Sequence, residues 1–243
     1  MGQPEPTGRA KGGDPPAVAE AGKHEEDLRS ITRIVLRPIG SPLPLGFFTV
    51  AIDSVLVSCL QWGIIPASHD RSVAMVVFPA FIMQVIAGIF ALVARDSIAA
   101  TLMLSFATTW LVDTLIFWAN PPGGHETIGI FFIVFSAFLA LIFISALEKR
   151  ALALVVGTAV PRFLVSGLAE VTASKPLAQA AAVLGLLLTA VALYTAFAFL
   201  WEDSRSQQLL PVGRLGPARA AVKGGLATEL WGIERQPGVR RTL

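Results

Sequence analysis

The chain has few of the residues from which soluble enzymes build their sites. Its 243 residues include one cysteine and three histidines, and charged residues make up 15%, against about 25% in soluble domains. The single Cys59 excludes an intrachain disulfide and a cysteine-cluster metal site. His24, His69 and His125 lie far apart in the sequence, so we expect neither a metal nor a cofactor. The net charge of +2 is too small to indicate a nucleic-acid partner.

Catalytic motifs are missing as well. The sequence contains no HExxH, no GxSxG, no Walker loop and no cysteine–histidine nucleophile pair. Its apolar stretches contain no histidine that could complete a serine–histidine pair. We therefore expect a protein that is not an enzyme.

Long apolar stretches dominate the sequence instead. Hydrophobic residues make up 54% of the chain, and the mean hydropathy is +0.66. A helix needs about 20 mainly apolar residues to cross a hydrocarbon core of ~30 Å. Six stretches meet that length, so we predict an all-α membrane protein with six transmembrane helices, at Gly46–Ile65, Arg71–Ala94, Ser97–Trp118, Ile128–Leu147, Ala151–Ala169 and Lys175–Trp201.

Basic residues gather on one side of these spans. Arg95 lies between the second and third spans, and Lys149 and Arg150 lie between the fourth and fifth. By contrast, no Lys or Arg lies between Ala119 and Thr127. The positive-inside rule then places both termini in the cytoplasm, and we expect the plasma membrane as the location. The predicted regions are a disordered or amphipathic cytoplasmic tail (1–40), a transmembrane transport domain (41–202) and a flexible cytoplasmic tail (203–243).

The segment before the first span has a row of arginines. Arg29, Arg33 and Arg37 recur every four residues. This spacing fits a short amphipathic helix that lies on anionic membrane lipid. It fits equally well a solvated basic linker that sets the topology.

Three ionisable residues lie within the apolar stretches: Asp53, Asp113 and Arg162. Such residues cost about 2.5–3.5 kcal/mol each on insertion scales, so they usually face the bundle interior and pair. At about 1.5 Å per residue, the depth of Arg162 falls between those of the two carboxylates. We therefore predict an ion pair between Arg162 and Asp113 or Asp53.

Hydroxyl side chains accompany these charges at four-residue spacing. Residues at this spacing lie near one another on a helix surface, and in a membrane such polar stripes face protein or water. They either line a solute pathway between the first, third and fifth spans or join the helices by hydrogen bonds. Pro161 removes a helical hydrogen bond and predicts a broken fifth span. The candidate pathway residues are Thr49, Asp53, Thr101, Ser105, Thr109, Asp113, Thr158 and Arg162.

Three local motifs surround the spans in a fixed order. Ser41-Pro42-Leu43-Pro44-Leu45-Gly46-Phe47 opens the first span, Gln84-Val85-Ile86-Ala87-Gly88 lies in the second, and Leu210-Pro211-Val212-Gly213 follows the sixth. This arrangement resembles the acetate uptake transporter family, whose opening motif is Asn-Pro-Ala-Pro-Leu-Gly-Leu and whose closing motif is Leu-Pro-Ile-Gly. That family includes bacterial acetate/succinate–proton symporters and fungal acetate and ammonia-export proteins. The motif residues of this chain are Pro42, Pro44, Leu45, Gly46, Gln84, Gly88, Leu210, Pro211 and Gly213.

The resemblance implies a six-helix subunit, a hexameric ring and a pore within each subunit. It also implies a narrow point made by apolar residues of the first, third and fifth spans, at Val50, Phe106 and Val160. The chain departs from the family in several places. Arg95-Asp96-Ser97 stands where Gly-Asn-Thr is typical, Phe106 replaces a tyrosine, and Asp53, Asp113 and Arg162 match no family charge.

These observations favour transport of a small monocarboxylate such as acetate, coupled to protons. Arg162 would attract the anion, and a buried carboxylate would carry the proton. Two alternatives remain open. One is a channel for ammonia or another small neutral solute, and the other is a non-transporting membrane scaffold.

Overall fold

The structure, a computed structural model, describes residues 40–205 and Leu210. Within these residues the chain is helical throughout and has no strand. The arginine-rich segment before the first span, and Pro211 and Gly213 of the closing motif, lie outside the described residues. The elements are α2 (Leu43–Trp62), η1 (Ala67–His69), α3 (Asp70–Val93), α4 (Ser97–Ala119), α5 (Gly124–Ala146), α6 (Arg150–Thr172) and α7 (Lys175–Arg205).

Six of these helices are long and apolar enough to cross a membrane, which confirms the predicted fold class. Their bounds differ from the expected ones by three or four residues at the starts of α2 and α5 and at the ends of α2, α6 and α7. α2 begins at Leu43, because Pro44 lies in its first turn, where the missing N–H has no helical partner to lose. α5 begins at Gly124 inside the expected loop, after Gly123, whose φ of 72° is accessible to glycine.

The predicted break at Pro161 is wrong. α6 runs without interruption from Arg150 to Thr172, and α3 likewise continues through Pro79. A proline removes its own N–H from the hydrogen-bond ladder, and the bonds above and below it can still hold the helix together.

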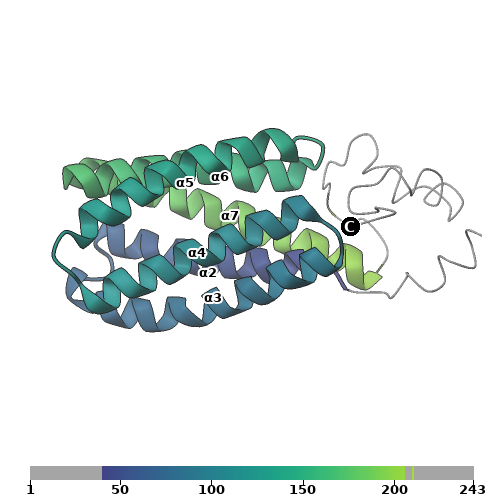
Figure 1. Ribbon diagram of the computed structural model, residues 1–243, viewed down its shortest axis with the longest axis horizontal. Coiled ribbons are helices and arrows are strands. Elements are labelled where there is room, and N and C mark those ends of the chain that lie inside the picture. The colour runs from purple at the N-terminus through teal and green to yellow at the C-terminus, as the bar shows by residue number, and fades with distance from the viewer. Residues whose placement is uncertain (1–39, 206–209, 211–243) are drawn as a thin grey trace, which may run out of the picture. The chain divides into compact units, whose positions relative to one another are not determined.

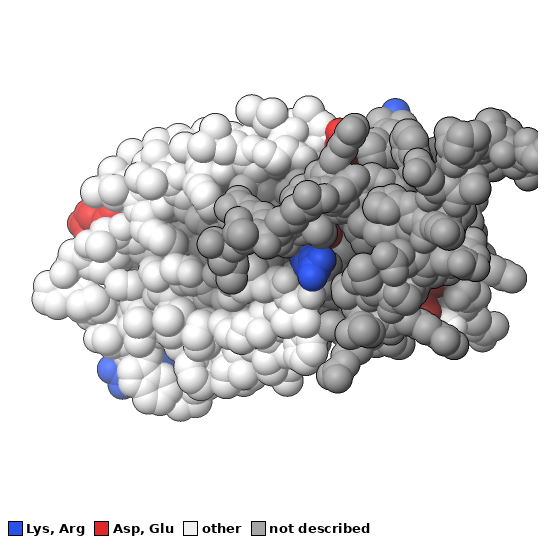
Figure 2. Space-filling view, turned by 45° about the vertical axis from the view of Figure 1, so that its right-hand side comes forward, with Lys and Arg blue, Asp and Glu red and all other residues white. Residues whose placement is uncertain are grey.

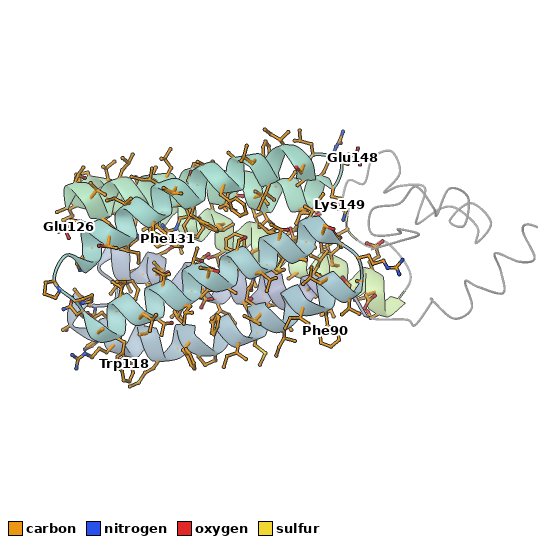
Figure 3. The ribbon with its side chains drawn as sticks, in the orientation of Figure 1. Phe90, Trp118, Glu126, Phe131, Glu148 and Lys149 are labelled. Carbon is orange, nitrogen blue, oxygen red and sulfur yellow. The ribbon has the colours of Figure 1, made fainter. Side chains whose placement is uncertain are left out.

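The six helices run side by side along one axis (Figure 1). α3 packs on α4 and α2, α2 on α7, α7 on α6, and α6 on α5, while α4 and α5 form the loosest seam of this ring. The connections α2–α3, α4–α5 and α6–α7 lie at one end, which we call the η1 end. The start of α2 and the end of α7 lie at the other, which we call the tail end. Trp118 and Glu126 mark the η1 end, and Glu148 and Lys149 mark the tail end (Figure 3).

The flank of the bundle is apolar. On the face shown in Figure 2, the visible charged side chains lie at the helix ends, and the flank between them carries none. The helices differ in how much of each one is buried inside the bundle. The spans of α2, α4 and α6 are 56%, 50% and 56% buried, whereas those of α3, α5 and α7 are 33–39% buried. The three helices whose sequences carry the polar stripes are therefore the most enclosed.

Two features hold neighbouring helices together: a close glycine crossing and an ion pair between two connections. A Cβ placed on Gly167 of α6 would lie 2.6 Å from the backbone oxygen of Gly129 on α5, so glycine is needed for this close crossing. At the tail end, Asp96 Oδ1 accepts a hydrogen bond from the N–H of Ala99 (3.1 Å) and caps α4. Asp96 Oδ2 pairs with Lys149 Nζ (2.5 Å), which joins the α3–α4 and α5–α6 connections.

Candidate transport site

A buried polar contact joins α2, α3 and α4 towards the tail end. The Thr49 hydroxyl lies within hydrogen-bond reach of the Gln84 amide oxygen and of the Gly46 carbonyl oxygen. The Gln84 amide nitrogen donates to Met103 Sδ (3.2 Å). We call Thr49, Gln84 and Met103 the polar joint. Thr49 and Gln84 are 5% and 0% exposed, so their polar groups are satisfied by protein alone.

The glycines of the family motifs belong to the same joint. A Cβ on Gly46 would lie 2.2 Å from Met103 Sδ, and one on Gly88 would lie 2.6 Å from Leu104 Cγ. Both glycines therefore let α4 pack closely on α2 and α3. The remaining described motif residues also have structural positions: Pro42 caps α2, Pro44 is buried in its first turn, Leu45 is exposed, and Leu210 packs on the core.

Aromatic side chains fill the middle of the bundle between α4, α5 and α6. The ring of Phe106 lies 5.9 Å from those of Phe135 and Phe163, and Phe135 lies 4.9 Å from Phe163. Trp110 stacks on Phe106 at 5.9 Å, and Phe132 lies 5.3 Å from Phe163. We call these five residues the aromatic cluster. All five are buried, so the cluster closes the centre of the bundle.

The residues expected at the narrow point occupy different environments. Val50 and Phe106 are both fully buried in the main core. Val160 is only partly buried, and its carbonyl accepts a hydrogen bond from Ser136 on α5 (3.0 Å). Residues two apart on a helix lie about 200° apart, so Val160 and Arg162 point to opposite sides of α6.

Phe163 is the α6 side chain that lies against Phe106, and the sequence interpretation missed it. The signal was present: Val156, Ala159 and Phe163 are buried at positions i, i+3 and i+7 of α6. That spacing marks the inward face of α6 independently of any family register.

A pocket of about 180 Å³ opens at the η1 end. Each of the six helices contributes to its lining, so the pocket lies on the axis of the ring. His125 Nδ1 lies 2.7 Å from Glu170 Oε2 at its wall, and Phe132 of the aromatic cluster also lines it. We call it the η1 pocket. One lining residue from each of α2 to α7 is, in order, Gln61, Asp70, Asp113, His125, Glu170 and Ala178.

Asp53, Asp113 and Arg162, which we call the charged trio, are 0%, 1% and 5% exposed. The predicted ion pair between Arg162 and a carboxylate is wrong: the ion pairs among the described residues are Lys149–Asp96 and His125–Glu170. The Arg162 side chain instead runs against α7, where a Cβ on Gly185 would lie 2.7 Å from its Nε. Asp113 remains near enough for its charge to interact with those of Arg162 and Asp53.

The trio also contains polar atoms without partners. Both carboxylate oxygens of Asp53, Oδ1 of Asp113 and Nη1 of Arg162 are buried and make no hydrogen bond. Buried polar atoms in native proteins are usually paired, so such atoms call for an explanation. Asp113 is also one of the residues that line the η1 pocket.

The hydroxyl stripe of α4 turns around the helix. A step of four residues overshoots a full turn by about 40°, so Thr101 is exposed whereas Thr109 and Asp113 are buried. Ser105 donates to the Thr101 carbonyl (2.5 Å), Thr109 donates to the Phe106 carbonyl (2.7 Å), and Thr158 of α6 donates to the Leu154 carbonyl. The hydroxyls thus bond within their own helices. Only the part of the stripe from Thr109 to Asp113 lies in the interior.

Sequence patterns also missed the walls of the η1 pocket. Gln61, His125 and Glu170 lie at helix ends, where no periodic pattern distinguishes them from loop residues. The sequence pattern did not single out Gly185 either, because the lack of a side chain there matters only where Arg162 lies against it.

Six membrane-length helices around an axial pocket define a multi-pass membrane protein of the transporter or channel class rather than an enzyme. Residues 27–216 match the model of the GPR1/FUN34/yaaH family, and the chain belongs to that family. This confirms the resemblance to acetate uptake transporters. Among solved structures the chain is similar to one described as the bacterial acetate channel SatP, with a TM-score of 0.66, 20% identity, 72% of this chain covered and 99% of that chain. That likeness concerns the fold. No curated protein matches the chain.

Proposed function

We propose that this protein moves a small monocarboxylate such as acetate across the plasma membrane, coupled to protons. The path runs within each subunit of a homo-hexamer, and the tail end faces the cytoplasm. Family membership supports acetate as the substrate class, since the structurally similar SatP is described as an acetate channel. The basic residues Arg95, Lys149 and Arg150 at the tail end support the orientation.

The η1 pocket is the observation that carries this proposal. It is lined by residues from all six helices, so it opens onto the axis of one subunit and not onto a surface between subunits. Asp113 lies in its lining, and the aromatic cluster, which α4, α5 and α6 contribute, lies beyond it. A solute that enters here meets a charged layer before an apolar one.

Arg162 supplies the attraction for an anion. The residue is 5% exposed, Nη1 has no hydrogen-bond partner, and no carboxylate lies within ion-pair distance among the described residues. An unpaired buried guanidinium favours a carboxylate ligand, since Arg matches carboxylate geometry with two parallel hydrogen bonds. The apolar layer at Val50, Phe106 and Phe163, in which Phe163 takes the place that the resemblance gave to Val160, then sets the width of the path.

Uptake of labelled acetate into proteoliposomes tests the proposal. Uptake above that of protein-free vesicles, which is faster when the vesicle interior is alkaline, is the expected result. Protein-free vesicles measure the passive flux of the undissociated acid and must be subtracted. Folded protein that gives no uptake above this background contradicts the proposal.

A second candidate is a channel for ammonia or another small neutral solute. Asp70, Asp113 and Glu170 line the η1 pocket, and carboxylates there disfavour a bare anion. The apolar aromatic cluster below would suit a neutral molecule. Ammonia flux without acetate flux in the same vesicles identifies this function, and the absence of both fluxes identifies a scaffold.

A further inference from the structure

Asp53 occupies an unusual position for a charged residue. It lies near the middle of α2, it is 0% exposed, and neither of its carboxylate oxygens has a hydrogen-bond partner. Val50 and Phe106, which pack in the same core, are fully buried as well. An ionised carboxylate without partners in an apolar site is very costly, so the neutral acid is the favoured form of this group.

A line of acidic side chains leads from the η1 end to this position. Glu170 on α6 is 23% exposed and contacts His125, which is 63% exposed. Asp113 on α4 comes next; it lines the η1 pocket, and its Oδ1 is buried without a hydrogen-bond partner. Successive members are near enough for their charges to interact, Glu170 with Asp113 and Asp113 with Asp53. Glu170, Asp113 and Asp53 thus form a series from the partly exposed η1 end to the buried middle of α2, with one member on each of α6, α4 and α2.

The other charged groups near this line come from different helices. Arg162 of α6 lies beside Asp113 and Glu170, and its charge interacts with both. Asp70 of α3 and His125 of α5 lie in the pocket lining, whereas α7 contributes the uncharged Ala178. A cation beside Asp113 makes that carboxylate a poor place to store a proton. Asp53 lies farther along and is in no ion pair among those the described residues form.

We propose that Asp53 is the proton-binding site of this transporter and that protons reach it from the η1 pocket through Asp113. The inference rests on the proposed proton-coupled transport and deepens it. In each step an O–H bond on a donor water or carboxylic acid breaks, its electron pair stays on the donor oxygen, and an O–H bond forms on the acceptor carboxylate. No oxidant or reductant takes part.

This assignment explains how a proton and an anion share one path. Asp53 lies one helical turn from Val50, at the level where the path is apolar. A negative charge there repels a carboxylate in a low-dielectric surrounding. Once Asp53 is neutral, that repulsion disappears, so passage of the anion depends on a bound proton.

Two transport measurements on the same proteoliposomes test the inference. The first is exchange of labelled acetate at equal pH on both sides, which needs no net proton movement. The second is initial uptake driven by an alkaline interior. In Asp53→Asn we expect exchange to be retained and the stimulation by the pH gradient to be lost. In Asp113→Asn we expect both measurements to fall, because protons no longer reach Asp53 and its negative charge then repels the anion. Glu126→Gln, a carboxyl-to-amide change at an exposed η1-end position, should leave both measurements at wild-type values.

Infrared difference spectra between acidic and alkaline buffer give a readout that a purely structural role would not move. The wild-type spectrum should contain the carbonyl stretch of a buried carboxylic acid, and Asp53→Asn should lack it. If Asp53→Asn fails to fold, Asp53→Glu keeps the carboxyl group and should keep the stimulation with a shifted band. Gradient stimulation in Asp53→Asn, or a band unchanged by substitution of Asp53, overturns the inference. Wild-type protein that shows no acetate exchange would instead refute the proposed function.

Discussion

The polar joint and the charged trio are both buried, both span several helices, and differ in one respect. In the polar joint, Thr49 and Gln84 meet one another, a carbonyl and a sulfur. In the charged trio, four polar atoms have no partner. The polar groups of the joint thus hydrogen-bond within the protein, whereas four polar atoms of the trio are left without a hydrogen-bond partner.

The difference separates architecture from function. A satisfied buried polar contact rigidifies the helices that share it, and an unsatisfied one is destabilising unless a ligand, a proton or a water completes it. The family motif residues Gly46, Gln84 and Gly88 belong to the satisfied group. Asp53, Asp113 and Arg162, which match no charge in the family pattern that the sequence resembles, belong to the unsatisfied group. The family motifs therefore account for the fold, and the departures are where to look for what distinguishes this transporter.

The largest expected effect concerns which end of the bundle faces out. Asp113 of the trio lines the pocket at the η1 end, and the proposed orientation places that end outside the cell. In a Cys59→Ala background, Glu126→Cys at the η1 end should react fully with an impermeant maleimide in intact cells. Glu148→Cys, equally exposed at the tail end, should react only after the cells are permeabilised. The reverse labelling pattern would show that the tail end faces out.

The second effect is on transport through the trio. Arg162→Leu should lower acetate uptake by about 10- to 100-fold, equivalent to about 1.4–2.8 kcal/mol, because the attraction for the anion is lost. Its thermal unfolding should change little, since no ion pair is broken. Arg71 is an exposed arginine at the η1 end, and Arg71→Leu is the matched control, which should transport normally. A large loss of stability in Arg162→Leu with normal uptake would make the trio a structural element like the joint.

A smaller effect concerns the apolar layer between the two groups. Phe163→Leu should raise the uptake of a longer carboxylate relative to acetate by a few-fold, because it shortens the side chain that meets Phe106. Val160→Ala serves as the comparison and should leave that ratio unchanged, since Val160 lies on the opposite side of α6 from Arg162. Competition between acetate and butyrate uptake measures both. A changed ratio in Val160→Ala alone would restore the narrow point implied by the family register.

The smallest effect on transport is expected in the joint. Gln84→Leu should lower the free energy of unfolding by about 1 kcal/mol, the usual scale of a hydrogen bond between membrane helices. Uptake per folded molecule should stay at the wild-type value. Thr49→Val and the double variant complete a thermodynamic cycle, in which a coupling near zero would mean that the two side chains do not stabilise each other.

Much of this molecule is readable from its sequence. Hydropathy gives the six spans, and the polar stripes identify α2, α4 and α6, which are the more enclosed helices. The family motifs lead to the correct family. These inferences depend on the length of apolar stretches, on local motifs and on spacing within one helix, and each of these is present in the sequence itself.

The rest depends on which residue lies opposite which, and spacing within one helix does not contain that information. Arg162 was expected to meet a carboxylate of similar depth, but its side chain lies along Gly185 of α7. Equal depth gives proximity along the membrane normal and leaves the direction around the helix undetermined. The exposed Thr101 shows the same limit on α4, since a repeat of four drifts away from the interior.

The connection between α3 and α4 differs from the pattern of the family that the sequence resembles. Where the family typically has Gly-Asn-Thr, this chain has Arg95-Asp96-Ser97, and Arg95 has a φ of 61°. A glycine adopts that conformation freely, and a residue with a Cβ is disfavoured there by about 1 kcal/mol. An asparagine at position 96 can cap α4 but cannot form an ion pair, whereas Asp96 caps α4 and also binds Lys149. An aspartate at position 96 thus adds an interaction beyond the helix cap only when a cation is present at position 149. Lineages that carry the aspartate should carry the lysine or an arginine with it.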